Sequence, residues 1–197
     1  MYEKHFGLKS RPFGSKAEGP AVFVGPRQAK MITSLQKGIA APDAVVTVTG
    51  PVGTGKTTIV DRALETLPTG RTAAHIGRMP LSAEEIVALV MGGFGIKKKS
   101  GGAIQRFAAF RRILQQQAQN GIPVAIVIED AQRLGVEALA EVEALTAADT
   151  GDAASGNIIL MGQPGLHDLL MKPELGRLKQ RLRLRLNAEP LSLPEVQ

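Results

Sequence analysis

The chain lacks cysteine altogether and contains few aromatic residues and few histidines. Its 197 residues include no tryptophan, one tyrosine and three histidines. Without cysteine, a disulfide framework, a thiolate metal site and a cysteine nucleophile are all excluded. His5, His75 and His167 lie too far apart in the sequence to indicate a local zinc-binding cluster. Any metal is therefore expected to be a hard ion held by oxygen atoms.

Long apolar runs are also missing. The longest, such as Val124 to Ile128, are far shorter than the roughly 18 residues that suggest a membrane span. The first residues contain no apolar stretch long enough for a signal peptide. We therefore expect a cytoplasmic chain, or the cytoplasmic part of a longer inner-membrane protein. The apolar content of 44% excludes a disordered chain.

Positive charge is concentrated near the end of the sequence. The net charge is +6, and residues 171–185 contain six basic residues and the single acid Glu174. Such a segment suits contacts with phosphate groups, although an exposed, solvated face explains it equally well. The basic residues are Lys172, Arg177, Lys179, Arg181, Arg183 and Arg185.

Short apolar runs alternate with helical patterns along most of the chain. The pattern predicts strands near residues 44–49, 71–76, 122–128, 157–161 and 182–186, with helices between them. Ser82 and Glu85 have the spacing of a capping box, which predicts a helix start. Alternation of this kind indicates an α/β fold with a parallel five-stranded sheet covered by helices on both sides. We expect a core at residues 41–190, preceded by a segment and a helix at 1–40 and followed at 191–197 by the start of a truncated lid or by a linker.

A glycine-rich motif follows the first predicted strand and precedes a helix. Residues 50–57 match G-x-x-x-x-G-K-[ST] at every fixed position. Glycines let the backbone N–H groups point inward at an anion, and the helix adds its positive N-terminal end. Lys56 is expected to reach the β- and γ-phosphates, and Thr57 to place its hydroxyl on Mg²⁺. The predicted nucleotide-binding residues are Gly50, Pro51, Val52, Gly53, Thr54, Gly55, Lys56, Thr57 and Thr58.

Two acids, Glu129 and Asp130, follow the most continuous apolar strand. Hydrolysis at a phosphate-binding loop needs an acid on the Mg²⁺ side and a group that orients the attacking water. We expect the two acids to supply these two groups. The alternative is a solvated turn in which Asp130 caps the next helix.

The order of these motifs resembles that of AAA+ ATPases, and other segments resemble the ExeA-like ATPases of the general secretion pathway. The resemblance covers essentially the whole chain and implies ATP or ADP with Mg²⁺ as ligands, nucleotide-dependent ring-like self-assembly, and a secretion or envelope partner. The opening segment also resembles that family, and Phe6 to Phe13 is expected either to wall the adenine pocket or to be ordinary core. The similar segments are Tyr2, Phe6-Gly7-Leu8, Pro12-Phe13, Ala131-Gln132-Arg133-Leu134, Gly162-Gln163-Pro164-Gly165-Leu166, Leu178 to Leu182 and Pro190-Leu191.

In similar proteins the first acid lies nearest the phosphates, which implies that Glu129 serves Mg²⁺ and Asp130 orients water. The same resemblance implies roles for two further residues. Gln163 falls where the family has a polar sensor of the γ-phosphate, although it also suits a plain turn. Arg181 falls where the family has an arginine finger that completes the site of a neighbouring subunit. The alternative for Arg181 is the solvated face of an amphipathic strand.

Two departures from the family pattern affect these expectations. The family usually has Asp then Glu after the third strand, whereas this chain has Glu129 then Asp130, so hydrolysis is expected to be slow. The sequence also stops at Gln197, where AAA+ chains normally continue into a helical lid, so a lid is not expected. Two other functions stay open. One is a DNA-binding AAA+ transposition regulator, and the other is a small-molecule P-loop kinase, which the paired acids disfavour.

Overall fold

A computed structural model describes residues 23–40, 42–67, 72–77, 80–97, 101–147 and 154–192 of the chain. In this part the helices are α2 (Pro26–Ala40), α3 (Lys56–Glu65), α4 (Ala83–Gly93), α5 (Ala103–Gln119), α6 (Val136–Thr146), α7 (Leu166–Leu170) and α8 (Gly176–Gln180). Two short 3₁₀ turns are η2 (Ala131–Arg133) and η3 (Pro173–Leu175). The strands are β1 (Val45–Thr49), β2 (Thr72–Ile76), β3 (Val124–Ile128), β4 (Asn157–Gly162) and β5 (Leu182–Asn187).

The five strands form one parallel sheet in the order β2-β3-β4-β1-β5. Because all strands run the same way, their carboxyl ends meet at one edge of the sheet and their amino ends at the other. We call these the carboxyl edge and the amino edge. The predicted parallel five-stranded sheet is confirmed, with strand ends that differ from the prediction by one or two residues.

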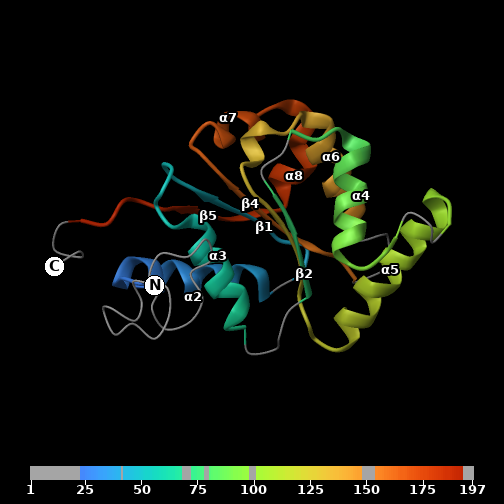
Figure 1. The fold of residues 1–197 in the computed structure, drawn as a ribbon, viewed down its shortest axis with the longest axis horizontal. Coiled ribbons are helices and arrows are strands. Elements are labelled where there is room, and N and C mark those ends of the chain that lie inside the picture. Colours follow the sequence, from blue (N-terminus) through green and yellow to red (C-terminus); the bar gives the residue numbers. More distant parts are fainter. Residues whose placement is uncertain are drawn as a thin grey trace, which may run out of the picture.

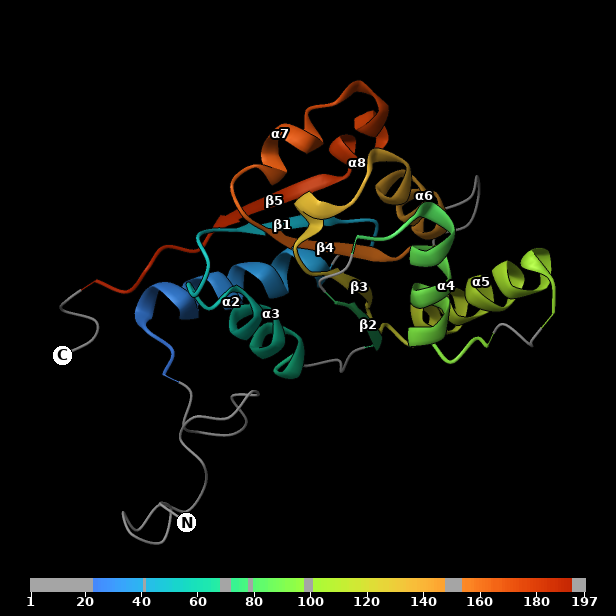
Figure 2. The same ribbon diagram turned by 45° about the horizontal axis from the view of Figure 1, so that its top comes forward.

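Helices cover both faces of the sheet (Figures 1 and 2). The α2 and α3 helices bury Leu35, Ile39 and Val60 against one face, while α4 to α8 cover the other. Successive residues of the central strands face opposite sides, so β1, β3 and β4 are buried along their whole length. This arrangement explains why those strands are continuous apolar runs rather than alternating ones.

The outer strand β5 differs from the central strands, because only β1 pairs with it. Its leucines are half-buried, whereas Arg183 and Arg185 are exposed. The predicted period of two is therefore confirmed. The capping box that starts α4 is also present: the Glu85 N–H donates to Ser82 Oγ, and the Ser82 N–H donates to Glu85 Oε2.

Candidate nucleotide-binding site

The loop between β1 and α3 curls back on itself at the carboxyl edge of the sheet. Gly53 and Gly55 have φ angles of 83° and 79°, a left-handed conformation that glycine adopts without steric cost. Gly55 also precedes the first residue of α3, so the N–H groups and the positive dipole end of this ten-residue helix face the loop. The local sequence therefore builds an anion-binding concavity from its own backbone.

Side chains of the same segment close the loop. Lys56 Nζ donates hydrogen bonds to the carbonyl oxygens of Gly50 (2.9 Å) and Pro51 (2.7 Å). Thr54 Oγ1 donates to the carbonyl of Pro51 at 3.0 Å. These contacts hold the lysine ammonium at the loop, where a bound phosphate would meet a positive charge.

A cavity of about 290 Å³ lies beside this loop. The cavity brings together eight predicted residues that come from three separate parts of the sequence, because β1, β3 and β4 end at the same edge. Met161 also lines it, and the eight predicted residues are Val52, Gly53, Gly55, Lys56, Thr57, Glu129, Asp130 and Gln163.

The two acids leave β3 in different backbone conformations. The Glu129 N–H donates to the carbonyl of Ile76 at 3.0 Å, which extends the pairing of β3 with β2. Asp130 has φ 48° and ψ 42°, and Asp is one of the few residues with a side chain that tolerate this left-handed conformation. The backbone thus gives a reason for Asp, rather than Glu, at the second position. The Asp130 side chain makes no capping hydrogen bond to η2, so the alternative role as a helix cap is wrong.

Gln132 contacts the site, but its role was not identified from the sequence. Its Oε1 accepts a hydrogen bond from the Gln163 N–H at 3.2 Å, and its Nε2 donates to Asp130 Oδ1 at 3.4 Å. In the sequence, Gln132 stands out only as part of the family-like segment Ala131-Gln132-Arg133-Leu134. Its link to Gln163 spans 31 residues, which a local pattern cannot indicate.

A second hollow, of about 170 Å³, is lined by part of the same loop. Thr58, the last predicted binding residue, lines it together with Gly53 and Gly55. Its apolar walls are Phe23, Val24, Ile32, Ile59 and Leu191. The segment from Phe6 to Phe13, predicted to wall an adenine pocket or to be core, lies outside the described residues.

The donors for a metal are the oxygens of Thr57, Glu129 and Asp130. Within the described ranges, no three His, Cys, Asp or Glu side chains gather closely enough to form a metal cage. This sparse set of oxygen donors fits Mg²⁺, which keeps several waters and is bound through one or two carboxylates together with substrate phosphates.

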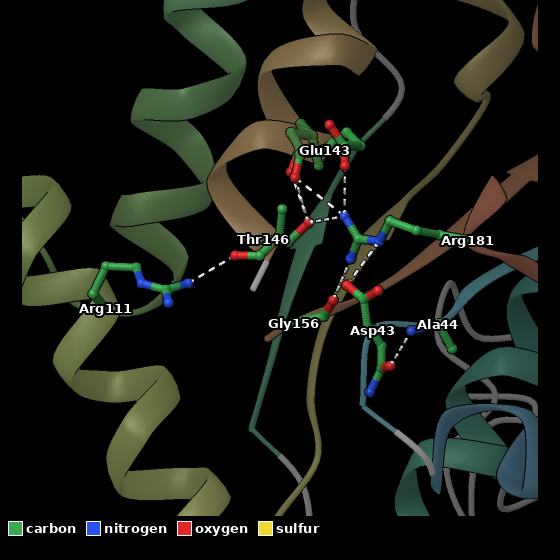
Figure 3. Close-up of polar contacts among 10 residues, drawn as sticks. Asp43, Ala44, Arg111, Glu143, Thr146, Gly156 and Arg181 are labelled. Atoms are coloured by element: carbon green, nitrogen blue, oxygen red, sulfur yellow. Dashed lines mark hydrogen bonds and ion pairs between the residues drawn. The ribbon is translucent and has the colours of Figure 1, made fainter. Parts of the chain in front are cut away.

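Arg181 does not fit the predicted role of an arginine finger. Its side chain is 8% exposed, and its guanidinium is surrounded by partners (Figure 3). Nη1 donates to the carbonyl, carboxylate and hydroxyl oxygens of Glu143 and Thr146 at 3.1–3.3 Å, and Nη2 donates to the Gly156 carbonyl at 2.8 Å. Nε also forms an ion pair with Asp43 at 3.0 Å. A side chain held in this way cannot extend into a neighbouring subunit.

The position of Arg181 in the sheet leads to the same correction. Its carbonyl accepts from the N–H of Val45, the first residue of β1, so Arg181 lies at the amino edge. Five residues of extended strand, about 16 Å, separate it from the loop at the carboxyl edge. The alternative role is also wrong, because Arg181 precedes β5 and is buried, unlike Arg183 and Arg185.

The parallel sheet and the glycine-rich loop at its carboxyl edge define a P-loop nucleotide-binding protein. More narrowly, the chain belongs to the AAA domain family, which matches residues 40–170. It is an AAA+ ATPase domain, and its sequence is similar to that of a general secretion pathway protein. General secretion pathway protein A from Aeromonas hydrophila is 29% identical to it over all 197 residues. The chain spans 36% of that relative's length.

Solved structures of an ORC2 protein and of Cdc6p share the fold. The ADP form of the Aeropyrum pernix ORC2 protein superposes with a TM-score of 0.67 at 14% identity, over 94% of this chain and 53% of that one. Cdc6p from Pyrobaculum aerophilum gives a TM-score of 0.65 at 15% identity, over 94% and 50% of the two chains. No helix in the described ranges has both the length and the apolar character needed to cross a membrane.

Proposed function

We propose that the chain binds ATP or ADP together with Mg²⁺ and hydrolyses ATP. The observation that carries this proposal is the single cavity in which Lys56 and Thr57 meet Glu129, Asp130 and Gln163. A cation, a hydroxyl, two carboxylates and an amide around a P-loop are the groups that phosphoryl transfer to water requires. The ADP and ADPNP–ADP complexes of the similar ORC2 protein support the choice of nucleotide.

Each residue of the cavity has a separate task in this proposal. The N–H groups of the loop and Lys56 hold the β- and γ-phosphates, while Thr57 and Glu129 face the Mg²⁺ position. When bound, Mg²⁺ neutralises charge on the phosphate oxygens. Asp130 orients the attacking water, and Gln163 contacts the γ-phosphate from the end of β4. Asp130 is one methylene shorter than the Glu usual in the family, so we expect slow turnover.

The base of the nucleotide is expected in the second hollow. Phe23, Val24 and Leu191 offer an apolar surface there, and the hollow shares Gly53 and Gly55 with the phosphate cavity. A nucleotide could therefore reach from one hollow to the other along the loop. Apolar walls with a few placed polar groups are the usual lining of such sites.

Substitution of Lys56 tests the nucleotide proposal directly. Among the described residues that line the cavity, Lys56 is the one with a cationic side chain. Lys56→Ala removes this charge, and we expect ATP affinity to fall about a hundredfold or more in calorimetry. Lys97→Ala, which removes an exposed lysine after α4, is the matched control and should bind as the unsubstituted chain does. Equal affinity for Lys56→Ala and the control would refute the proposal.

Nucleotide-dependent self-assembly and a role in secretion or in building the cell envelope form the finer part of the proposal. The supporting observation is the similarity to General secretion pathway protein A over the whole chain. Since Arg181 is buried, another residue must complete any site shared between subunits. Sedimentation velocity with and without a non-hydrolysable ATP analogue would test assembly, and an unchanged sedimentation coefficient would count against it.

Binding to duplex DNA is a second candidate function. Residues 172–185 carry five exposed cations, from which the buried Arg181 is excluded: Lys172, Arg177, Lys179, Arg183 and Arg185. Cations of this kind neutralise phosphates, so affinity should fall steeply as salt is raised. Filter binding to duplex DNA across a salt series tests this candidate, and binding that is absent at low salt would exclude it.

A further inference from the structure

The amide of Gln132 joins the end of β3 to the end of β4. It accepts from the Gln163 N–H and donates to Asp130 Oδ1, at 3.2 Å and 3.4 Å. The link continues into the phosphate-binding loop, because the Gly162 carbonyl accepts from the Gly50 N–H at 3.1 Å. The Gln132 side chain thus connects the Asp130 carboxylate with the Gln163 backbone N–H, and both of these residues line the cavity.

The position requires a group that accepts and donates at once. A backbone N–H needs an acceptor and an ionised carboxylate needs a donor, so only one orientation of the Gln132 amide satisfies both. Gly162 leaves room for this amide, since a Cβ at that position would collide with Gln132 Oε1. The bond to Asp130 is the longer of the two.

We propose that Gln132 is a positioning residue that holds the Asp130 carboxylate and the Gln163 backbone as one unit. The inference rests on the proposed ATP hydrolysis. Because Asp130 is the shorter acid, its reach to a water depends on how its carboxylate is fixed, and errors of about 1 Å are costly in such geometry. Gln132 supplies this support from outside the cavity, without contacting the nucleotide.

Two variants of similar size separate the two hydrogen bonds. Gln132→Met removes both, whereas Gln132→Glu keeps an acceptor for the Gln163 N–H but cannot donate to Asp130 and repels it. In the nucleotide-free chain, amide exchange at Gln163 should quicken about fivefold in Gln132→Met and stay within about twofold in Gln132→Glu. Both variants should lower kcat about tenfold or more while the Kd for nucleotide stays within about twofold.

Gln116→Met and Gln116→Glu, at an exposed position of α5, are the matched controls and should change neither quantity. Wild-type exchange at Gln163 in Gln132→Met would overturn the inference. A parallel loss of kcat, nucleotide affinity and Tm would also overturn it, because that result indicates a purely structural role. A wild-type chain that binds nucleotide without turnover would refute the proposed hydrolysis. The exchange measurement would still decide whether Gln132 holds Gln163.

Discussion

The two ends of β1 have opposite polar environments. At the carboxyl edge, Lys56 and the two acids line a cavity and are only half-buried. At the amino edge, Arg181 is buried and its guanidinium is surrounded by oxygen atoms from Asp43, Glu143, Thr146 and Gly156. Both cations were predicted to act on phosphate. The comparison shows that burial and existing partners, rather than residue type, separate a candidate functional cation from a structural one.

The buried hydrogen bonds and ion pairs of Arg181 connect several segments at the amino edge. Arg181 joins the end of α6, the start of β4 and the segment before β1, which are far apart in the sequence (Figure 3). Arg111 adds to this region by donating to the Ala147 carbonyl at 2.8 Å. These bonds satisfy backbone carbonyl groups at the end of α6 and just before β4. The network therefore stabilises the packing of these segments against each other.

Of the substitutions that test this difference, Arg181→Met is expected to have the largest effect, on the free energy of unfolding. The change leaves the buried Glu143 carboxylate without its cation, and breaking such a pair typically costs about 3–5 kcal/mol. Urea denaturation should show this loss in the free energy of unfolding, whereas the Kd for nucleotide measured below the transition stays unchanged. Arg183→Met, an exposed arginine two residues along, should change stability by no more than about 0.5 kcal/mol. Similar effects of the two substitutions would remove the distinction between buried and exposed arginines.

The acids of the carboxyl edge should show the opposite behaviour, in which activity changes and stability does not. Asp130→Asn should lower kcat about a hundredfold, or roughly 3 kcal/mol in activation free energy, while ATP still binds. Glu129→Gln should instead weaken the Mg²⁺-dependent part of binding. Steady-state kinetics and calorimetry at several Mg²⁺ concentrations measure the two effects. If Asp130→Asn abolished Mg²⁺-dependent binding and Glu129→Gln left it intact, the two roles would be reversed.

The smallest effect is expected from the exposed capping box on α4. Ser82→Ala removes the cap, which typically costs about 1 kcal/mol of stability. Ser34→Ala, in the interior of α2, is the control and should not destabilise the chain.

The capping box also predicts a pH dependence. Hydrogen bonds from the backbone and then the side chain of Ser82 lower the pKa of Glu85 below its usual 4.5. A lowered carboxyl pKa in the folded state stabilises the fold above the unfolded pKa and loses this effect as the pH falls through the folded value. The stability difference between the parent chain and Ser82→Ala should therefore shrink as the pH is lowered below about 4.5. A difference that grows under acid would contradict this linkage.

The strands and helix starts could be predicted because the residues that determine them are contiguous in the sequence. The apolar runs of β1, β3 and β4 predict strands buried on both faces, and the capping box marks the start of α4 within one residue. The arrangement of the cavity also follows from the sequence once the strands are known to be parallel, since Glu129, Asp130 and Gln163 each follow a strand.

By itself the sequence determined the phosphate-binding loop, whose glycines, lysine and threonine lie within eight residues and whose geometry is mainly a matter of backbone sterics. Only the tertiary structure decided the roles of Arg181 and Gln132. The oxygen atoms around Arg181 come from residues 25 to 138 positions away, and Gln132 joins the ends of two different strands. Burial and hydrogen-bond saturation are properties of packed elements. An arginine at the start of a strand therefore has the same local pattern whether it points into solvent or into the core.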